Sequence, residues 1–143
     1  MAETSAGTAT VAEAVVEIKA EGDVVLARQA GRELAREAGF GSADQTRLAT
    51  AISELVRNVI QHAGEGVCQV VCESDEEWAR VRATVEDHGP GIPDIDKAMA
   101  EGFSTARSMG VGLLAASRLV HEFDIKSEPG HTVVAVAMAR RKL

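Results

Sequence analysis

The chain has 143 residues, 45% of them hydrophobic and 26% charged, which favours one globular domain that buries a core of its own. Its formal net charge of −7, its 3% aromatic content and the lack of any basic cluster before Arg140-Arg141-Lys142 argue against nucleic-acid binding. No apolar run approaches the roughly 18 residues of a membrane span, and the N-terminus does not resemble a signal peptide, so no membrane partner is expected.

The N-terminal part of the chain is expected to contain one strand and one helix. Residues 1–10 are rich in Ala, Thr, Ser and Gly, so we expect them to be disordered, with a single domain over residues 11–143. Residues 12–19 alternate weakly between apolar and polar, as in a strand. Residues 23–39 carry apolar side chains at helical spacing and end at a glycine, which predicts a helix.

A second helix is predicted from Ser42 to about His62. Gln45 follows Ser42 by three residues, which is the pattern of a capping box. Gly64 is well suited to end the helix, because glycine readily adopts the left-handed conformation found there.

One edge of this helix carries candidate site residues. Glu54, Asn58 and His62 follow one another at intervals of four, so they share one side of the helix. Such an edge offers a hard oxygen ligand for a metal ion and a general base. A solvated polar edge has the same pattern, so this feature alone leaves both interpretations open.

Residues 66–73 and 78–86 alternate with period two and are predicted to form a hairpin. Cys68 and Cys72 lie on the same side of the first strand, at a spacing that does not fit a metal site, so we expect buried free thiols. Free thiols fit a reducing compartment and a cytoplasmic location. Trp78 and the three Phe residues are expected in the core.

The segment Asp87-His88-Gly89-Pro90-Gly91 directly follows the second strand of this hairpin. A carboxylate fixed at the end of a strand can accept a hydrogen bond from an exocyclic amine, and the two glycines allow close approach of a planar ligand. Proline and glycine are also the usual residues of a simple turn, so the segment alone does not decide between the two.

The C-terminal part is predicted to contain a short helix over 94–100, a loop over 101–109, a helix from 110 to about 120 and two strands, 123–128 and 132–139. Gly110 and Gly112 would expose free N–H groups at a helix N-terminus, which is suited to phosphate, although two glycines before a helix also arise by chance. Helices gather early and hairpin strands late, which predicts an α+β two-layer sandwich.

Taken together, these segments resemble a known family. Glu54–Asn58 (ELVRN), Asp87–Gly91 (DHGPG) and Gly110–Gly112 (GVG) resemble the N, G1 and G2 boxes of the GHKL ATPase superfamily, and Gly130–Thr132 (GHT) resembles its late Gly-x-Thr. The resemblance covers about residues 12–140. It implies the Bergerat fold, with a mixed, mostly antiparallel sheet covered on one face by helices.

The same resemblance implies ATP and Mg²⁺ as cofactors and assigns roles to residues. Glu54 would be the general base, Asn58 the Mg²⁺ ligand and Asp87 the adenine reader, assisted by Thr132. The full set of residues implied to contact ATP is Asn58, His62, Asp87, Gly89, Gly91, Ile92, Ser104, Thr105, Gly110, Val111, Gly112, Leu113 and Thr132.

Five segments resemble the RsbT subfamily of the anti-sigma regulatory kinase branch: 27–35, 52–58, 86–96, 102–105 and 109–113. This resemblance implies a serine/threonine kinase of a stressosome partner-switching module. Its substrates would be STAS-domain scaffold and antagonist proteins, and on release it would activate a PPM-type phosphatase. The segment Ala106-Arg107-Ser108 has less glycine than in RsbT-like proteins, and His62 is more typical of the RsbW-type branch.

Two other functions use the same chain without phosphoryl transfer. In the first, ATP orders the segment over 92–109 and so selects a partner, such as a sigma factor or a phosphatase, in a non-catalytic switch of the RsbW type. In the second, the chain is a plain interaction domain with a degenerate pocket, against which the complete set Glu54, Asn58 and Asp87 argues. The kinase and the switch share their pocket residues, so the sequence does not separate them.

Overall fold

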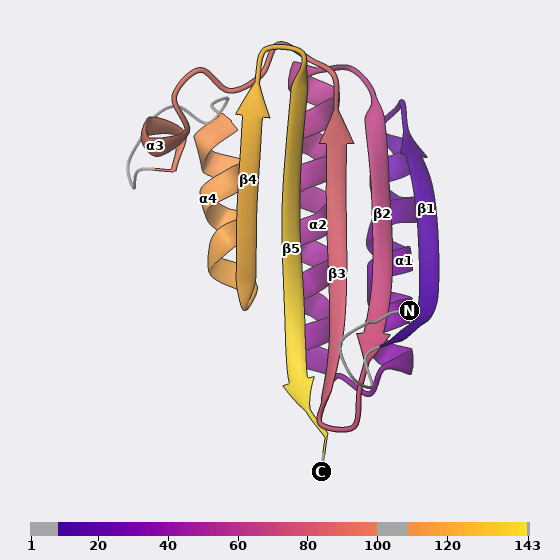
Figure 1. Cartoon of the computed structure of the whole chain (residues 1–143). Coiled ribbons are helices and arrows are strands. Elements are labelled where there is room, and N and C mark those ends of the chain that lie inside the picture. Colours follow the sequence, from indigo (N-terminus) through magenta and orange to yellow (C-terminus); the bar gives the residue numbers. More distant parts are fainter. Residues whose placement is uncertain (1–8, 100–108, 143) are drawn as a thin grey trace.

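A five-stranded sheet forms one layer of the protein, and helices form a second layer on one of its faces (Figure 1). The computed structural model describes residues 9–99 and 109–142. In chain order the elements are β1 (Ala9–Ile18), α1 (Gly22–Glu37), α2 (Ser42–His62), β2 (Gly66–Ser74), β3 (Trp78–Asp87), α3 (Ile95–Ala98), α4 (Met109–Leu119), β4 (Glu122–Glu128) and β5 (His131–Arg141). The predicted α+β sandwich with helices on one face is confirmed.

The strand order is β1-β2-β3-β5-β4, and every pairing between the described strands is antiparallel. The expectation of a mixed sheet was therefore wrong. β4 runs in the same direction as β3, but β5 is inserted between them, so these two strands never pair. The insertion also places the end of β3 beside the start of β5, with Asp87 opposite Thr132.

The core lies between the helical face of the sheet and the inner sides of α1, α2 and α4. Inward positions alternate along the strands, as in β3, where Val81 and Val85 are buried. In α2 the apolar stripe is almost fully buried, and each such aliphatic side chain contributes roughly 1.5–3 kcal/mol to folding. α2 is therefore held firmly against the sheet, which fixes the positions of the polar residues along its edge.

The start of α2 differs from the predicted capping box. Gly41 is the N-cap, and Ser42 is already helical, so no side chain caps the helix. Gln45 donates from Nε2 to the Phe40 carbonyl oxygen at 2.8 Å, instead of completing a box with Ser42. The predicted helix end is confirmed: Gly64 has a φ of +90°, and its N–H donates to the Val59 carbonyl at 2.9 Å.

Trp78 was wrongly expected in the core. Strand alternation turns Ala79 inward and Trp78 outward, which leaves Trp78 42% exposed, with the Arg141 guanidinium 6.0 Å from its ring centre. Phe40 is buried and Phe123 packs against the core as expected, whereas Phe103 lies outside the described residues.

β1 begins at Ala9, so the first strand includes two residues of the segment 1–10 that was expected to be disordered.

Both cysteines are buried free thiols, as predicted. Burial raises the pKa of the Cys68 thiol to about 12, and it also raises the pKa of Cys72, with further contributions from the Glu37 and Glu73 carboxylates. The thiolate is the reactive form of cysteine, so neither residue is suited to nucleophilic chemistry.

No helix within residues 9–99 and 109–142 is long and apolar enough to cross a membrane.

Candidate functional site

The edge of α2 predicted from the sequence faces α4 and the end of β3. The Glu54 side chain is 32% exposed, with its Oε2 3.6 Å from Arg57 Nη1, a separation at which a partly exposed pair contributes little. Asn58, one turn later, is buried to 9% exposure. The Asn58 amide and the Glu54 carboxylate, on consecutive turns of α2, therefore lie on the edge that faces α4 and the end of β3.

The carboxylate of Glu54 lies against the first turn of α4. A Cβ placed on Gly112 would be 3.4 Å from Glu54 Oε1, in ordinary van der Waals contact. α4 begins at Met109, so Gly110 and Gly112 belong to its first four residues, not to a loop before it. The first four N–H groups of a helix have no partner within the helix, so this turn is suited to an anion.

Leu113 is fully buried and belongs to the hydrophobic core, so its side chain anchors α4 to the fold. Ser104 and Thr105, which the family resemblance implied to contact ATP, lie outside the described residues. For Val111 the structure places only the backbone, within α4.

Asp87 ends β3 and is buried, with 6% of its surface exposed. Its Oδ1 accepts the Gly89 N–H at 2.9 Å, which leaves Oδ2 for another donor. Gly89 must be a glycine here, because a Cβ would lie 2.5 Å from the Ala63 Cβ. The glycine-rich segment thus packs directly on the end of α2 and holds the Asp87 carboxylate in place.

Thr132 lies opposite Asp87 on β5 and is 4% exposed. Its Oγ1 is 2.6 Å from Ser127 Oγ, and the same Ser127 oxygen accepts the Ile92 N–H at 2.8 Å. Ser127 was not predicted from the sequence. The strand pattern could have indicated it, because Phe123, Ile125 and Ser127 occupy the inward positions of β4. A polar residue in a series of inward apolar positions needs a hydrogen-bond partner inside the protein.

These residues enclose a small cavity lined by Asn58, His62, Ala63, Asp87, Pro90, Gly91, Ile92 and Thr132. Its volume is about 10 Å³, the space of a single water molecule. His62 Nε2 is buried there without a hydrogen-bond partner, the one such side-chain atom among the described residues. The fold therefore brings Asn58, His62, Asp87, Gly91, Ile92 and Thr132 together around one polar hollow.

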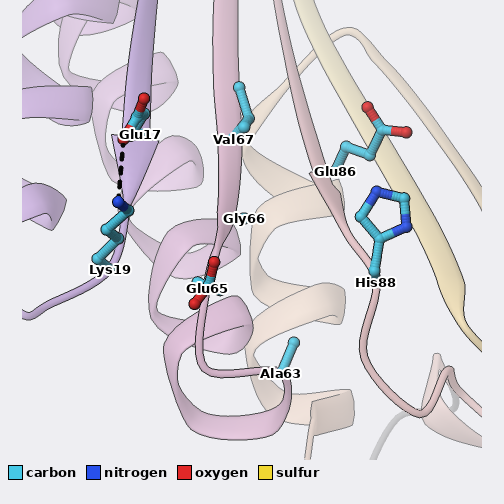
Figure 2. A pocket seen from close by; sticks show the side chains of 8 residues that line it. All are labelled: Glu17, Lys19, Ala63, Glu65, Gly66, Val67, Glu86 and His88. Atoms are coloured by element: carbon cyan, nitrogen blue, oxygen red, sulfur yellow. Dashed lines mark ion pairs between the residues drawn. The ribbon is translucent and has the colours of Figure 1, made fainter.

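A much larger cavity, about 530 Å³, lies on the other side of β3 (Figure 2). Glu86 and His88, which flank Asp87 in the sequence, line it together with Glu17, Glu65 and Lys19. Three carboxylates against one ammonium group repel phosphate, and this cavity shares only Ala63 with the small one. The larger volume therefore does not identify the nucleotide site.

The described residues contain no group of three or more His, Cys, Asp or Glu side chains arranged to hold a metal ion. Mg²⁺ commonly takes only one or two protein oxygens, with the remainder from phosphates and water. The buried Asn58 amide, next to the Glu54 carboxylate and the first turn of α4, is an oxygen donor of that kind. A Mg²⁺ ion carried in with a phosphate chain would therefore fit at Asn58.

Replacing Gly91 with alanine is expected to destabilise the protein more than replacing Gly64 does. Both residues have a left-handed φ, +88° and +90°, which costs an alanine about 1–2 kcal/mol. A Cβ on Gly91 would also lie 2.7 Å from the Glu128 carbonyl oxygen, whereas Gly64 has nothing within 4 Å. Overpacking adds about 1–3 kcal/mol. Urea unfolding of the two variants measures the difference, and equal losses would contradict the tight contact.

Comparison with known proteins places this site in context. Residues 16–138 match the histidine kinase-like ATPase domain family. Serine/threonine-protein kinase RsbT of Bacillus subtilis is 47% identical over 115 residues, covering 80% of this chain and 86% of that protein. Anti-sigma F factor of Thermoanaerobacter sp. (strain X514) is 32% identical over 85 residues, covering 57% of this chain and 59% of that protein.

A solved structure of the RsbU and RsbW domains of a Mycobacterium tuberculosis protein superposes with a TM-score of 0.60. The match covers 89% of this chain but only 33% of that longer chain, at 23% sequence identity. At this level of identity the likeness concerns the fold alone.

Proposed function

The chain belongs to the histidine kinase-like ATPase domain family, and from this premise we propose that it is an ATP-dependent serine/threonine protein kinase of a partner-switching module. The observation that carries the proposal is the meeting of Glu54 with the first turn of α4, close to buried Asn58. A carboxylate, an amide oxygen and free N–H groups there suit a phosphate chain and a hydroxyl that attacks it. The 47% identity to a protein named as a serine/threonine kinase supports the same function.

In this proposal the adenine ring enters between Asp87, Thr132 and the Pro90–Ile92 wall. Asp87 Oδ2 accepts a hydrogen bond from the adenine amine, because Oδ1 already accepts from Gly89. The cavity of about 10 Å³ is far smaller than a purine, so binding requires this wall to move outward. The buried His62 Nε2, which has no hydrogen-bond partner among the described residues, then gains one in the bound nucleotide.

The phosphates lie at the first turn of α4, where the free N–H groups and the helix dipole offset their charge. Asn58 would hold Mg²⁺, which neutralises part of the charge that develops on the phosphates. The Glu54 carboxylate takes the proton of a Ser or Thr hydroxyl, the hydroxyl oxygen bonds to the γ-phosphorus, and the bond to the β–γ bridging oxygen breaks, releasing ADP. Positioning and electrostatics supply most of the rate.

The proposed substrates are STAS-domain scaffold and antagonist proteins, and the proposed partner after release is a PPM-type phosphatase, all in the cytoplasm. These partners follow from the likeness to the RsbT subfamily. The anti-sigma F relatives, at 32% identity, favour a second candidate: a nucleotide-gated switch that binds a sigma factor. Phosphate appearing on a Ser or Thr of the partner distinguishes a kinase from a switch that only binds.

Replacing Asn58 with alanine is expected to remove the effect of Mg²⁺ on ATP affinity. The wild-type protein should bind ATP more tightly with Mg²⁺ than with EDTA, because Asn58 supplies one oxygen ligand to the ion. The variant should bind ATP equally under both conditions, at about the affinity of the wild type in EDTA. Calorimetric titration measures all four affinities. If the variant keeps the full response to Mg²⁺, the metal assignment is wrong.

A further inference from the structure

We propose that Ser127 is a positioning residue that fixes the direction of the Thr132 hydroxyl and thereby makes the site select adenine over guanine. This inference rests on the proposed binding of ATP. It concerns a residue that no sequence motif indicated, at the end of β4, two strands away from Asp87.

Ser127 joins two parts of the site. It lies opposite Thr132 in the β4–β5 pairing, with 2.6 Å between their hydroxyl oxygens. The Ile92 N–H donates to Ser127 Oγ at 2.8 Å. Ile92 and Thr132 both line the small cavity, so one partly buried hydroxyl holds two of its walls.

The hydrogen of Ser127 has one suitable acceptor. A hydroxyl has one hydrogen to donate and two lone pairs to accept with, and the Ile92 N–H occupies one lone pair. Within the described parts of the chain, Thr132 Oγ1 is the one other partner of Ser127 Oγ. If Thr132 donated to Ser127, the Ser127 hydrogen would be left without an acceptor. The hydrogen bonds therefore run from Ile92 to Ser127 to Thr132.

This direction leaves the Thr132 hydrogen free to be donated into the cavity. Chains of hydrogen bonds polarise one another, so the Ser127 bond also strengthens Thr132 as a donor. Asp87, opposite Thr132, can only accept. The site thus presents an acceptor beside a donor on two paired strands of the sheet.

An acceptor beside a donor complements adenine and opposes guanine. Adenine offers an amine at its sixth position and an acceptor nitrogen next to it, whereas guanine has a carbonyl oxygen at that position. Guanine would set its oxygen against the buried Asp87 carboxylate and leave both without a donor, which sites of this kind penalise strongly. Without Ser127, the Thr132 hydroxyl is free to rotate and is a poorer donor to the acceptor nitrogen of adenine, so the preference for adenine narrows through weaker ATP binding.

The test compares ATP and GTP affinities of Ser127→Ala and Ser127→Thr with those of the wild type, by calorimetric titration with Mg²⁺. The wild type is expected to prefer ATP by about a hundredfold or more, as expected for a site that must leave polar groups unpaired to accept the wrong base. Ser127→Ala should narrow the ratio of the two affinities about tenfold, chiefly through weaker ATP binding, whereas Ser127→Thr keeps the hydroxyl and should restore the ratio. Thermal unfolding confirms that each variant is folded. Should the alanine variant not fold, Ser127→Cys keeps the shape with a weak donor and should narrow the ratio too.

A folded Ser127→Ala or Ser127→Cys variant with the wild-type ratio of ATP to GTP affinity would overturn the inference. Equal losses of both affinities would also overturn it, because they indicate a merely structural role. A wild-type protein that binds neither nucleotide would instead refute the proposed function, and the inference with it. That failure is visible in the first titration, before any variant is examined.

Discussion

Replacing Glu54 with alanine is expected to abolish phosphoryl transfer and to leave ATP binding nearly unchanged. The carboxylate lies beside the first turn of α4, where the phosphates are proposed to bind, so it meets the acceptor hydroxyl and not the adenine. A general base contributes about 10²- to 10⁴-fold to a rate, so transfer should fall by at least a hundredfold. ATP affinity should stay within about threefold, since the variant removes a negative charge near the phosphates and does not remove a binding contact.

Single-turnover transfer measured with saturating variant and limiting ATP separates the chemical step from binding. Glu54→Gln keeps the shape of the side chain without a proton acceptor of comparable strength, and it should be nearly as inactive as the alanine variant. Glu65→Ala is the matched control, because it removes a carboxylate from the larger cavity on the other side of β3. Transfer retained by Glu54→Ala would show that another group takes the proton.

Replacing Asp87 with asparagine is expected to weaken ATP binding about 10- to 150-fold, as the loss of a hydrogen bond to a buried charged group implies. Asparagine has a single side-chain oxygen, and the Gly89 N–H already requires one acceptor at that place. The amide nitrogen would then face the adenine amine, donor against donor. Because Asp87 is only 6% exposed, little water is available to separate the two groups.

The matched control for this variant is Glu86→Gln. Glu86 precedes Asp87 in β3 but faces the opposite side of the sheet, where its carboxylate pairs with His131. Both substitutions remove one negative charge from neighbouring positions, so a general electrostatic effect would appear in both. The Glu86→Gln affinity should remain close to that of the wild type. An unchanged affinity of a folded Asp87→Asn variant would refute the role of Asp87 in adenine recognition.

Local patterns in the sequence predicted most of the elements but not how they meet. The spacing of Glu54, Asn58 and His62 was sufficient to place them on one helical edge, since helix geometry depends only on near neighbours. That this edge faces Asp87 follows from the packing of α2 on the sheet, and that Thr132 lies beside Asp87 follows from the pairing of β5 with β3. Both are long-range contacts that no local pattern specifies. The contacts between these residues were anticipated only through resemblance to a family.

The residues that sequence reasoning missed depend on three-dimensional contacts. Ser127 gains its importance from Ile92, which is 35 positions away in the chain and reaches it only because the glycine-rich segment folds over the end of β4. The hydrophobic character of Trp78 suggested a core position, but strand alternation turns its side chain outward. Gly41 replaced Ser42 as the N-cap because the helix begins one residue earlier than the capping-box pattern assumes.

The most direct test is transfer of labelled γ-phosphate from ATP to a STAS-domain protein from the same source, in the presence of Mg²⁺. We expect label on a Ser or Thr of that protein with the wild-type protein and with Glu65→Ala, and none with Glu54→Ala. If wild-type protein binds ATP but leaves its γ-phosphate in place with every STAS-domain protein of that source, the chain is not a kinase of this module.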